Sequence, residues 1–499
     1  MSSILALDQG TTGSTALVLH QDGRLLGRGY REFTQHFPRP GWVEHDPEEI
    51  VRVTLAAARE AIAAARETPV GIGITNQRET VVIWDRRTLQ PVAPAIVWQD
   101  RRTAERCREL KAAGAETLVR DRTGLVLDPY FSATKLEYLL RDPETRRRAE
   151  RGELAAGTID SWLVARLTGG RLHVTDHTNA SRTMLYDLAS REWEPELLTL
   201  FGVPRTVLPA IVSSSGVIGE SDASHFGQSL PIAGIAGDQQ AALFGQGCIR
   251  EGLAKNTYGT GAFLLTFTGQ RRPRSGSGLL VTAACGPRGE PAYALEGSVF
   301  IAGAAVQWIR DGLGLITRAH ETEALARSVS DTGGVYFVPA FVGLGSPHWE
   351  AEARGTIVGL TRGTTRAHLV RAALEAMAFS SADLLQAMTA DAGLGLAALR
   401  VDGGAAANDW LMQCQSDVIG VPVERPDNVE TTALGAAGLA GIALGVWGSV
   451  DEFLAGRRFT RFEPVIGATE REERWQGWRR AVRATLAWAR APQEGTGPG

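Results

Sequence analysis

The stretch that decides the fold is ILALDQGTTG, residues 4–13. Its first four residues are apolar and indicate a short buried strand, and the polar, glycine-containing residues after them are typical of a tight turn. An apolar, β-branched run from Thr15 to Leu19 follows at once, and Asp22-Gly23 marks a second hairpin turn. The start of the chain therefore predicts strand, turn and strand, with the first turn at the end of a buried strand.

A similar pattern recurs in the middle of the chain. NTYGTG at residues 256–261 is again a Gly/Thr turn, and it leads directly into FLLTF at residues 263–267. The two turns are separated by about half of the 499 residues. We therefore expect two similarly built α/β halves with a cleft between them, an N-terminal domain of residues 1–249 and a C-terminal domain of residues 250–499. The alternative is coincidence, because Gly/Thr turns are common.

The segments between the two turns alternate between helical and extended patterns. Pro47 to Arg66 is alanine-rich with helical spacing, and Asp46 with Pro47 is suited to a helix start. Apolar runs at residues 70–74 and 81–84 predict two strands. This alternation is typical of the α/β class. The last residues, 491–499, are rich in proline, glycine and glutamate, and we expect them to be frayed.

Composition places the chain among water-soluble globular proteins. Hydrophobic residues make up 44% and charged residues 22%, and the net charge of −4 lacks the basic excess of nucleic-acid binders. The four cysteines are scattered without Cys-x-x-Cys spacing, which favours a reducing compartment over a zinc site or disulfide framework. No signal peptide is apparent. Residues 433–447 are apolar but shorter than the roughly 20 residues needed to span a bilayer. We therefore expect a cytoplasmic protein without membrane insertion, in which this stretch is a buried helix.

The two Gly/Thr turns are candidates for binding phosphate. Glycine allows the backbone to approach a ligand closely, successive N–H groups form an anion-binding nest, and threonine hydroxyls add donors. Asp8, at the end of the first predicted strand, would repel phosphate but could hold an accompanying Mg²⁺. No Walker A sequence is present. A third cluster, VDGGAAAN at residues 401–408, could approach a flat ring or an anion, although a plain strand-to-helix turn would give the same sequence.

Asp238 is the candidate general base. It follows the apolar run IAGIAG at residues 232–237, and ligands in open α/β sheets bind beyond the carboxyl ends of strands. A carboxylate there could take the proton of a hydroxyl nucleophile that attacks phosphorus. The alternative is a helix N-cap, because Asp238 precedes Gln-Gln-Ala-Ala. The two roles do not exclude each other.

A polar run, TNQRET at residues 75–80, lies between two apolar strands and is a candidate polyol site. The Arg78–Glu79 pair presents both donors and acceptors to adjacent hydroxyls. Trp98 and Tyr130-Phe131 could pack against a carbon chain. The alternative interpretations are a solvated loop for residues 75–80 and ordinary core packing for the aromatic residues.

Taken together, these segments resemble the FGGY family of carbohydrate kinases, and within it the glycerol kinases, from Ile4 to about Trp488. The first turn and the Asp-Gly-Gly cluster resemble the whole family, whereas NQRET and DPYF resemble the glycerol kinases specifically. The segments that carry the resemblance are residues 8–12, GWVEHDP at 41–47, 75–80, Trp98-Gln99, DPYF at 128–131, 237–246 and 256–263.

The resemblance implies an α/β fold of two actin-like, ribonuclease H-like domains of the sugar kinase type, with the active site in the interdomain cleft. It implies ATP-dependent phosphorylation of glycerol to sn-glycerol 3-phosphate with Mg²⁺, in which Asp238 is the general base. The glycerol contacts carried over by position are Arg78, Glu79, Tyr130, Asp238 and Gln239, with Trp98 and Phe263 on the carbon face. The nucleotide contacts carried over are Thr11, Thr12, Gly13, Thr260, Gly303, Gln307, Gly404 and Asn408.

The chain also departs from the family pattern. Glycerol kinases often have arginine where this chain has Thr15, so one phosphate contact is missing or supplied elsewhere. No loop resembles the allosteric fructose bisphosphate site of enterobacterial enzymes. The run SHFG at residues 224–227 resembles instead a loop whose histidine is phosphorylated by a histidine phosphocarrier protein, which makes His225 a regulatory candidate. An ordinary surface histidine is an equally good interpretation of His225.

Three functional hypotheses follow from the sequence. The first is a kinase for glycerol, and the family resemblance adds an expected homodimer or homotetramer. The second is a related kinase for a pentulose or a tetritol, which would need a roomier site than Arg78, Tyr130 and Phe263 leave. The third is a chaperone or filament-forming ATPase of the same broad fold, which would leave the polyol residues unexplained.

Overall fold

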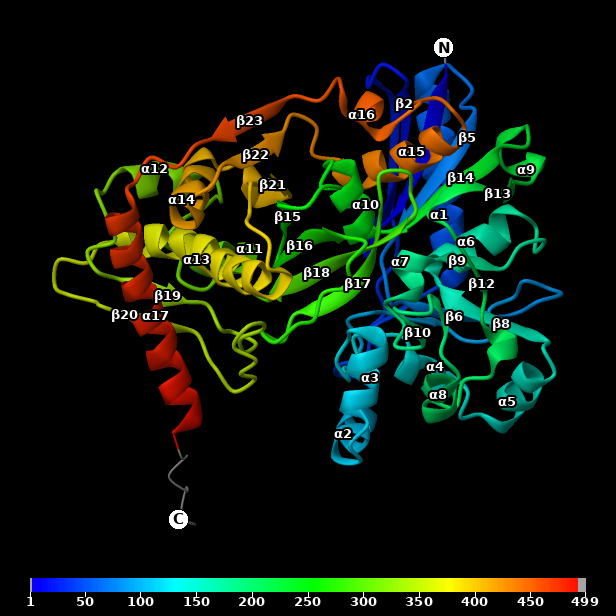
Figure 1. The fold of residues 1–499 in the computed structure, drawn as a ribbon, viewed down its shortest axis with the longest axis horizontal. Helices are drawn as coiled ribbons and strands as arrows, with labels where there is room; N and C mark the ends of the chain where they lie inside the picture. Colours follow the sequence, from blue (N-terminus) through cyan, green and yellow to red (C-terminus); the bar gives the residue numbers. More distant parts are fainter. Residues whose placement is uncertain (1, 492–499) are drawn as a thin grey trace.

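A computed structural model describes residues 2–491, and its first sheet grows from the N-terminal strands (Figure 1). Strands β1 (Ser3–Gln9), β2 (Gly13–His20) and β3 (Leu25–Glu32) pair in antiparallel fashion. Residues 4–7 of β1 are fully buried, as the apolar run predicts. The predicted strand, turn and strand are confirmed.

Two further strands extend this sheet in parallel with β1. β5 (Gly71–Asn76) pairs with β1, β14 (Pro231–Gly237) pairs with β5, and β13 (Ser215–Glu220) closes the edge in antiparallel fashion. Helix α1 (Pro47–Ala65) packs on β2 and β3, and the Asp46 side chain caps its start. A side chain at Gly29 would lie 2.1 Å from the Ala57 carbonyl oxygen, so glycine permits this close contact. The helix predicted at residues 47–66 is confirmed.

The second sheet has the strand order β17-β18-β16-β15-β21-β22-β23. Its strands are β15 (Leu253–Tyr258), β16 (Ala262–Gly269), β17 (Leu280–Cys285), β18 (Pro291–Val299), β21 (Ala398–Asp402), β22 (Val423–Pro426) and β23 (Phe459–Phe462). Within it, β18-β16-β15-β21-β22 has the strand order and directions of β3-β2-β1-β5-β14. The repeated Gly/Thr turn therefore marks two similarly built halves.

Each lobe carries additional elements around its main sheet. The first lobe adds a small sheet of β4 (Glu44–His45), β7 (Ala95–Ile96), β6 (Val81–Asp85) and β8 (Leu154–Thr158). Its other elements are α2 (Ala104–Ala112), α3 (Glu116–Thr123), α4 (Ala133–Leu139), α5 (Pro143–Glu150), α6 (Ile159–Leu167), β9 (Val174–Asp176), α7 (His177–Ala180), β10 (Tyr186–Asp187), β11 (Glu192–Trp193), α8 (Pro195–Leu200), η1 (Arg205–Val207), β12 (Ala210–Val212) and α9 (Ala223–Phe226). The second lobe adds α11 (Gly303–Asp311), α12 (Glu321–Arg327), β19 (Tyr336–Val338), β20 (Thr356–Val358), α13 (Arg366–Ala392), η2 (Gly404–Ala407), α14 (Asp409–Ile419) and α17 (Ala468–Arg490). The short helix α16 (Val450–Leu454) comes late in the chain but lies beside the first sheet (Figure 1), where Val450 and Phe453 join the same core cluster as Ile4.

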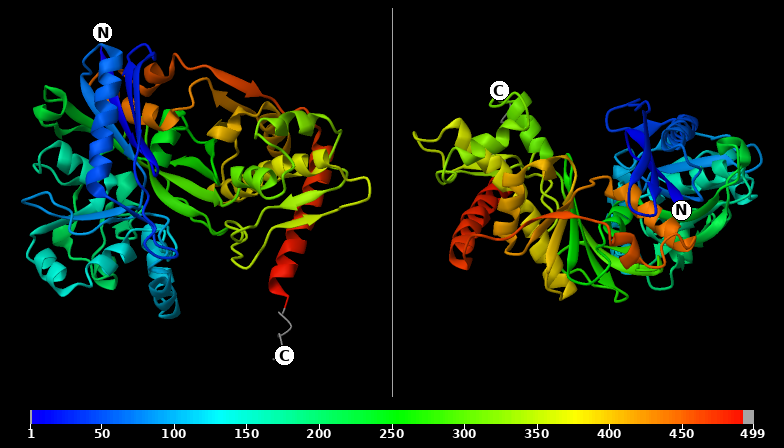
Figure 2. Two further views of the ribbon diagram at one scale, coloured as in Figure 1. Left: turned by 180° about the vertical axis from the view of Figure 1, so that it is seen from behind. Right: turned by 90° about the horizontal axis from the view of Figure 1, so that it is seen from above.

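Two helices pack against each other between the sheets. α10 (Asp238–Gly245) follows β14, and α15 (Thr431–Ala443) follows β22 but packs on β1, β5 and β14 (Figures 1 and 2). A side chain at Gly435 would lie 1.9 Å from the Ala241 carbonyl oxygen, which explains the small residues here. The buried helix expected within residues 433–447 is confirmed, although its last residue is Ala443. The chain thus passes between the lobes more than once.

Two expectations from the sequence are not tested by the structure. The division at residues 249 and 250 stays a prediction, because α15 belongs to the later half of the chain and covers the first sheet. Residues 492–499 of the tail lie outside the described residues. Among the helices of residues 2–491, none has the length and apolar character to cross a bilayer.

Candidate active site

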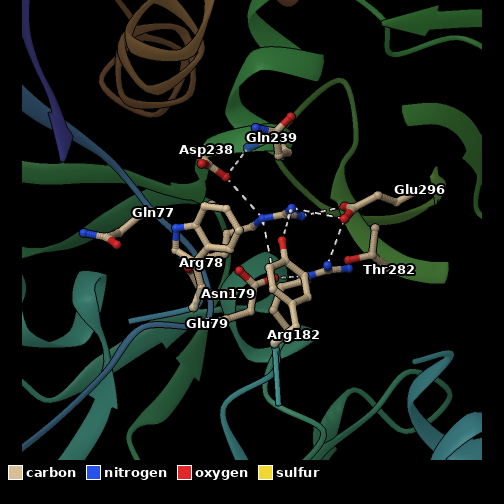
Figure 3. A network of polar contacts seen from close by, with 12 residues as sticks. Gln77, Arg78, Glu79, Asn179, Arg182, Asp238, Gln239, Thr282 and Glu296 are labelled. Carbon is tan, nitrogen blue, oxygen red and sulfur yellow. Dashed lines mark hydrogen bonds and ion pairs between the residues drawn. The ribbon is translucent and has the colours of Figure 1, made fainter. Parts of the chain in front are cut away.

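The site forms where β5 and β14 end. Because these strands are parallel neighbours, the residues that follow them meet at one edge of the sheet. Arg78 Nε lies 3.1 Å from Asp238 Oδ1, and Figure 3 shows the two side chains pointing toward each other. Gly237 is the N-cap of α10 and Asp238 is its first residue, so the N-cap interpretation of Asp238 is not borne out. Its side chain stays 31% exposed, which leaves the carboxylate open to a substrate.

A buried ionic network surrounds Arg78. Its Nη1 donates to Glu296 Oε2 at 2.6 Å and its Nη2 to Glu296 Oε1 at 3.1 Å. Arg182 donates through Nε to Glu79 Oε1 at 2.6 Å and through Nη2 to Glu296 Oε1 at 2.8 Å. Each of these four side chains is at most 2% exposed. The predicted Arg78–Glu79 pair is therefore half of a four-residue network, which we call the ionic square (Figure 3).

The environment acts differently on the two carboxylates of the ionic square. Burial tends to raise the pKa of Glu296, but the charges of Arg182 and Arg78 lower it to about 2. Burial raises the pKa of Glu79, against the opposing charges of the same two arginines. Glu79 also has a left-handed backbone, with φ of 63°. Such a conformation is uncommon outside glycine and is concentrated at functional sites.

Aromatic side chains line the same region. The Tyr130 hydroxyl accepts a hydrogen bond from Arg78 Nη2 at 3.5 Å, and burial raises the pKa of Tyr130. Trp98 packs edge-on against Tyr130 with ring centroids 5.6 Å apart. Trp98 Nε1 also donates to Thr11 Oγ1 at 2.9 Å, so one indole ring links the polyol candidates to the first Gly/Thr turn.

The second lobe contributes one face of its sheet. Lys255 Nζ donates to Thr257 Oγ1 at 2.9 Å and to Gln239 Oε1 on α10. Phe263 pairs directly with Thr257, so its side chain is on the same face, and Glu296 pairs with Leu265 on that face as well. Burial lowers the pKa of Lys255 to about 8. The bond between Lys255 and Gln239 therefore joins the two lobes, with the predicted Gln239 on the first lobe and the predicted Phe263 beside Lys255 on the second.

Sequence reasoning missed Arg182, Lys255 and Glu296. All three are fully buried, and each contacts a residue that was predicted. A signal was available for two of them, because Lys255 and Glu296 are single charges inside the otherwise uncharged runs LAKNTY and PAYALEGSV. A charge within a central strand is costly unless it is paired.

Each of the two Gly/Thr turns is closed by a backbone hydrogen bond between two of its glycines, although the second turn is one residue shorter. In the first, Gly10 N donates to Gly13 O at 2.9 Å, and in the second, Gly259 N donates to Gly261 O at 2.8 Å. Thr12 and Thr260 are exposed at these turns.

Asp8 is the penultimate residue of β1 and lies beside the first turn. Burial, followed by the nearby charges of Asp238 and Glu430, raises its pKa to about 8. Within residues 2–491 no lysine or arginine forms an ion pair with Asp8, so a bound cation would suit this carboxylate. The same residues contain no group of three or more His, Cys, Asp and Glu side chains arranged to hold a metal ion. Thr15, at which the sequence departs from the expected family pattern, pairs with both Asp8 and Tyr30.

A cavity in the second lobe collects the remaining nucleotide candidates. It has a volume of about 490 Å³, within the range of small-molecule sites. The predicted residues that line it are Thr260, Gly303, Gln307, Gly404 and Asn408. Arg310, His320 and Glu323 also line it and were not predicted. Asn408 caps α14 through Leu411 N at 3.0 Å and donates to Thr322 at 3.2 Å, so its side chain is held in place.

His225 lies apart from these groups. It is part of the short helix α9 at the outer end of the first lobe (Figure 1). Its Nε2 lies 3.2 Å from the Arg166 carbonyl oxygen, and its own carbonyl accepts from Arg59 Nε at 3.0 Å. Because a carbonyl only accepts, Nε2 carries the proton in this contact.

Comparison with known proteins agrees with this arrangement. Residues 3–245 match the N-terminal domain of the FGGY family of carbohydrate kinases, and residues 254–444 match its C-terminal domain. Glycerol kinase from Carboxydothermus hydrogenoformans is 56% identical over 97% of this chain and 98% of that protein. Glycerol kinase from Deinococcus radiodurans is also 56% identical, over 97% of this chain and 98% of that protein.

Solved structures show the same similarity. Plasmodium falciparum glycerol kinase with ADP superimposes with a TM-score of 0.93 at 37% identity, covering 97% of this chain and 98% of that one. Xylulose kinase from Rhodospirillum rubrum gives a TM-score of 0.86 at 25% identity, covering 97% and 98%. The predicted two-domain sugar kinase fold is confirmed, and the chain belongs to the FGGY family of carbohydrate kinases.

Proposed function

We propose that this protein is an ATP-dependent glycerol kinase, which transfers the γ-phosphoryl group of ATP to a terminal hydroxyl of glycerol and forms sn-glycerol 3-phosphate and ADP. The observation that carries the proposal is the meeting of Asp238, Arg78 and Tyr130 beside the first Gly/Thr turn. The relatives that are 56% identical over nearly the whole chain are named glycerol kinases, which supports the same substrate.

In this proposal Asp238 is the general base. Its exposed carboxylate accepts the proton of the attacking hydroxyl, while the remaining residues orient glycerol for in-line attack on phosphorus. Arg78, Glu79, Tyr130 and Gln239 bind the hydroxyls, and Trp98 with Phe263 covers the carbon face. Because the ionic square is buried and each member has a fixed partner, these groups are oriented before glycerol arrives.

ATP and Mg²⁺ complete the reaction. The adenosine part fits the 490 Å³ cavity, next to Gly303, Gln307, Gly404 and Asn408. Thr11, Thr12 and Gly13 would contact the phosphates from the first lobe, and Thr260 from the second. Asp8, which lacks a cationic partner within residues 2–491, would hold Mg²⁺ directly or through water. The ion supplies positive charge that offsets the charge of the transferring phosphoryl group.

The cleft position implies movement of the lobes. The two Gly/Thr turns belong to different sheets, so closure of the lobes would bring both turns onto one triphosphate. We place the domains at residues 1–249 and 250–499, with α10 and α15 packed against each other between them. Closure would exclude water from the reacting groups.

Three finer expectations stay predictions. They are the cytoplasmic location, a homodimer or homotetramer, and regulation by a histidine phosphocarrier protein at His225. In the structure, Nε2 of His225 donates to the Arg166 carbonyl, so Nδ1 has the lone pair that a phosphoryl group would meet. A phosphocarrier that used Nε2 would first have to break this contact.

The deciding experiment measures ADP release by the purified protein with Mg-ATP and one added substrate. Glycerol, dihydroxyacetone, erythritol, xylulose and no substrate are compared. We expect release with glycerol and its three-carbon analogue at rates far above the others. A preference for erythritol or xylulose would keep the fold and overturn the proposed substrate. Hydrolysis that is independent of any added substrate would favour the ATPase hypothesis.

A further inference from the structure

Glu296 connects the two lobes inside the polyol site. It lies on β18 of the second sheet, whereas Arg78, Arg182 and Glu79 all come from the first lobe. Its Oε2 accepts from Arg78 Nη1 at 2.6 Å, and its Oε1 accepts from Arg78 Nη2 at 3.1 Å and from Arg182 Nη2 at 2.8 Å. One carboxylate from the second lobe thus binds both arginines of the first (Figure 3).

The contact with Arg78 fixes the direction of its guanidinium group. Glu296 holds both Nη atoms, and because the group is planar this leaves Nε aimed at Asp238, 3.1 Å away. Without the bidentate partner, the Arg78 side chain could rotate about its last bonds and lose this alignment. The geometry at Asp238 therefore depends on a fully buried residue that comes from the other lobe.

Stability alone does not account for this arrangement. A buried ion pair loses the hydration of both partners, and well-packed apolar residues often serve a fold equally well. The ionic square also leaves Arg182 Nη1 buried without a hydrogen-bond partner among residues 2–491, which is a further cost. An arrangement with such costs is more readily explained if the exact direction of the arginines matters.

We propose that Glu296 is a positioning residue for the polyol site, acting through Arg78 and Arg182. This inference rests on the proposed function, and it makes the glycerol site depend on both lobes. Glycerol then binds well only when β18 of the second sheet is docked against the ends of β5 and β14. The nucleotide cavity, whose lining does not include Glu296, is not affected directly.

The test uses steady-state kinetics of the full-length protein with three variants. Glu296→Gln removes the charge and keeps the shape, and Glu296→Asp keeps the charge and shortens the side chain. The matched control is Glu375→Gln, because Glu375 is also a buried partner of an arginine, Arg371 Nε at 3.0 Å, but lies on α13 outside the ionic square. Wild-type activity with glycerol is measured first, because its absence would contradict the proposed function and not the role of Glu296.

We expect Glu296→Gln to raise the KM for glycerol by about 10- to 100-fold while the KM for ATP changes less than about 3-fold. Glu375→Gln should leave the glycerol KM within about 2-fold of wild type, even if its melting temperature falls. A glycerol KM in Glu296→Gln that matches the control would overturn the proposal. If Glu296→Gln does not fold, Glu296→Asp decides: a raised glycerol KM with an unchanged ATP KM supports the proposal, and unchanged values for both contradict it.

Discussion

The polyol side of the cleft and the nucleotide cavity are built in opposite ways. Charged side chains form the polyol side, where Arg78, Glu79 and Glu296 are almost completely buried and held by several contacts each. Glycines, other small residues and the helix-capping Asn408 form much of the nucleotide cavity, which is open and has a volume of about 490 Å³. Glycerol carries no charge and few atoms, so its recognition requires exact donors and acceptors. A nucleotide brings its own charges and a large ring, so an open shape with fewer fixed groups is sufficient.

This difference arises although the two sheets share one strand order. Both lobes have a Gly/Thr turn between their first two strands, and both have a long helix between the third and fourth matching strands. The first lobe adds the small sheet of β4, β7, β6 and β8, which places Trp98 and Tyr130 next to the strand ends. The second adds α11 and α12, which line the cavity. The polyol site and the nucleotide cavity therefore differ because each lobe adds different elements to the same strand arrangement.

The largest effect is expected at the point where chemistry occurs. Asp238→Asn should lower kcat by about 100-fold or more, since a positioned general base contributes roughly 10²–10⁴-fold. The amide can still accept a hydrogen bond from Arg78 Nε, so folding and glycerol affinity should be nearly unchanged. The measurements are kcat, glycerol binding by calorimetry and the melting temperature. A near-normal kcat would remove Asp238 from the base role.

Gly404→Val tests the nucleotide cavity alone. A side chain added at Gly404 meets no protein atom within 4 Å and so enters the cavity. Crowding of a packed contact costs about 1–3 kcal/mol, which corresponds to a rise of roughly 5- to 150-fold in the KM for ATP. The glycerol KM should stay within about 2-fold of wild type. Gly395→Val is the control, because that exposed glycine also has open space but lies outside the cavity. Equal changes in both KM values would show that the two regions are not independent.

A pH experiment examines the charges of the polyol side. Burial lowers the pKa of Lys255 to about 8, so between pH 7 and 9 it passes from mostly charged to mostly neutral. Its bond to Gln239 then loses its charge assistance, which is worth about 1 kcal/mol, or roughly a 5-fold rise in glycerol KM. Lys255→Met should raise the KM at pH 7 and remove this step. A step that persists in the variant would assign it to another group.

The lowered pKa of Lys255 also predicts how the stability of the fold changes with pH. The folded protein releases the Lys255 proton near pH 8, whereas the unfolded chain keeps it until about pH 10.5. The unfolded state therefore binds more protons in this window, and the contribution of Lys255 to the free energy of unfolding increases with pH. In denaturant unfolding, the free energy of unfolding of the wild type, relative to that of Lys255→Met, should be larger at pH 9 than at pH 7.5. A decrease relative to the variant would mean that the pKa is raised instead.

Local sequence patterns could predict the framework and the residues at strand ends. ILALDQGTTG and NTYGTG carry strand and turn signals within ten residues. Asp238 directly follows a buried strand, and Arg78 is two residues beyond the end of another. The general rule on strand ends marked Asp238 as a ligand-facing residue, and the family resemblance added Arg78 to the same site. The packing of α15 on the first sheet was not predictable in this way, because its residues give no sign of which sheet they cover.

The ionic square was beyond local patterns for a related reason. Glu296, Arg182 and Arg78 are separated by more than 100 residues from one another, and their pairing depends on how the lobes dock. Arg78 and Arg182 are each compatible with an exposed charge. What the sequence did contain was the mismatch of Glu296 within an apolar strand, which indicates a partner without identifying it.

The smallest effect is expected at His225, which neither region contacts. His225→Ala removes the bond to the Arg166 carbonyl and should reduce the free energy of unfolding by about 1 kcal/mol, with kcat and both KM values within about 2-fold of wild type. Chemical denaturation and steady-state kinetics measure the two quantities. A change in the glycerol KM of the unphosphorylated variant would contradict this independence. Such an effect would have to pass from α9 through β13 and β14 to Asp238. The polyol side would then extend to the outer edge of the first sheet, where a phosphoryl group on His225 could change glycerol binding.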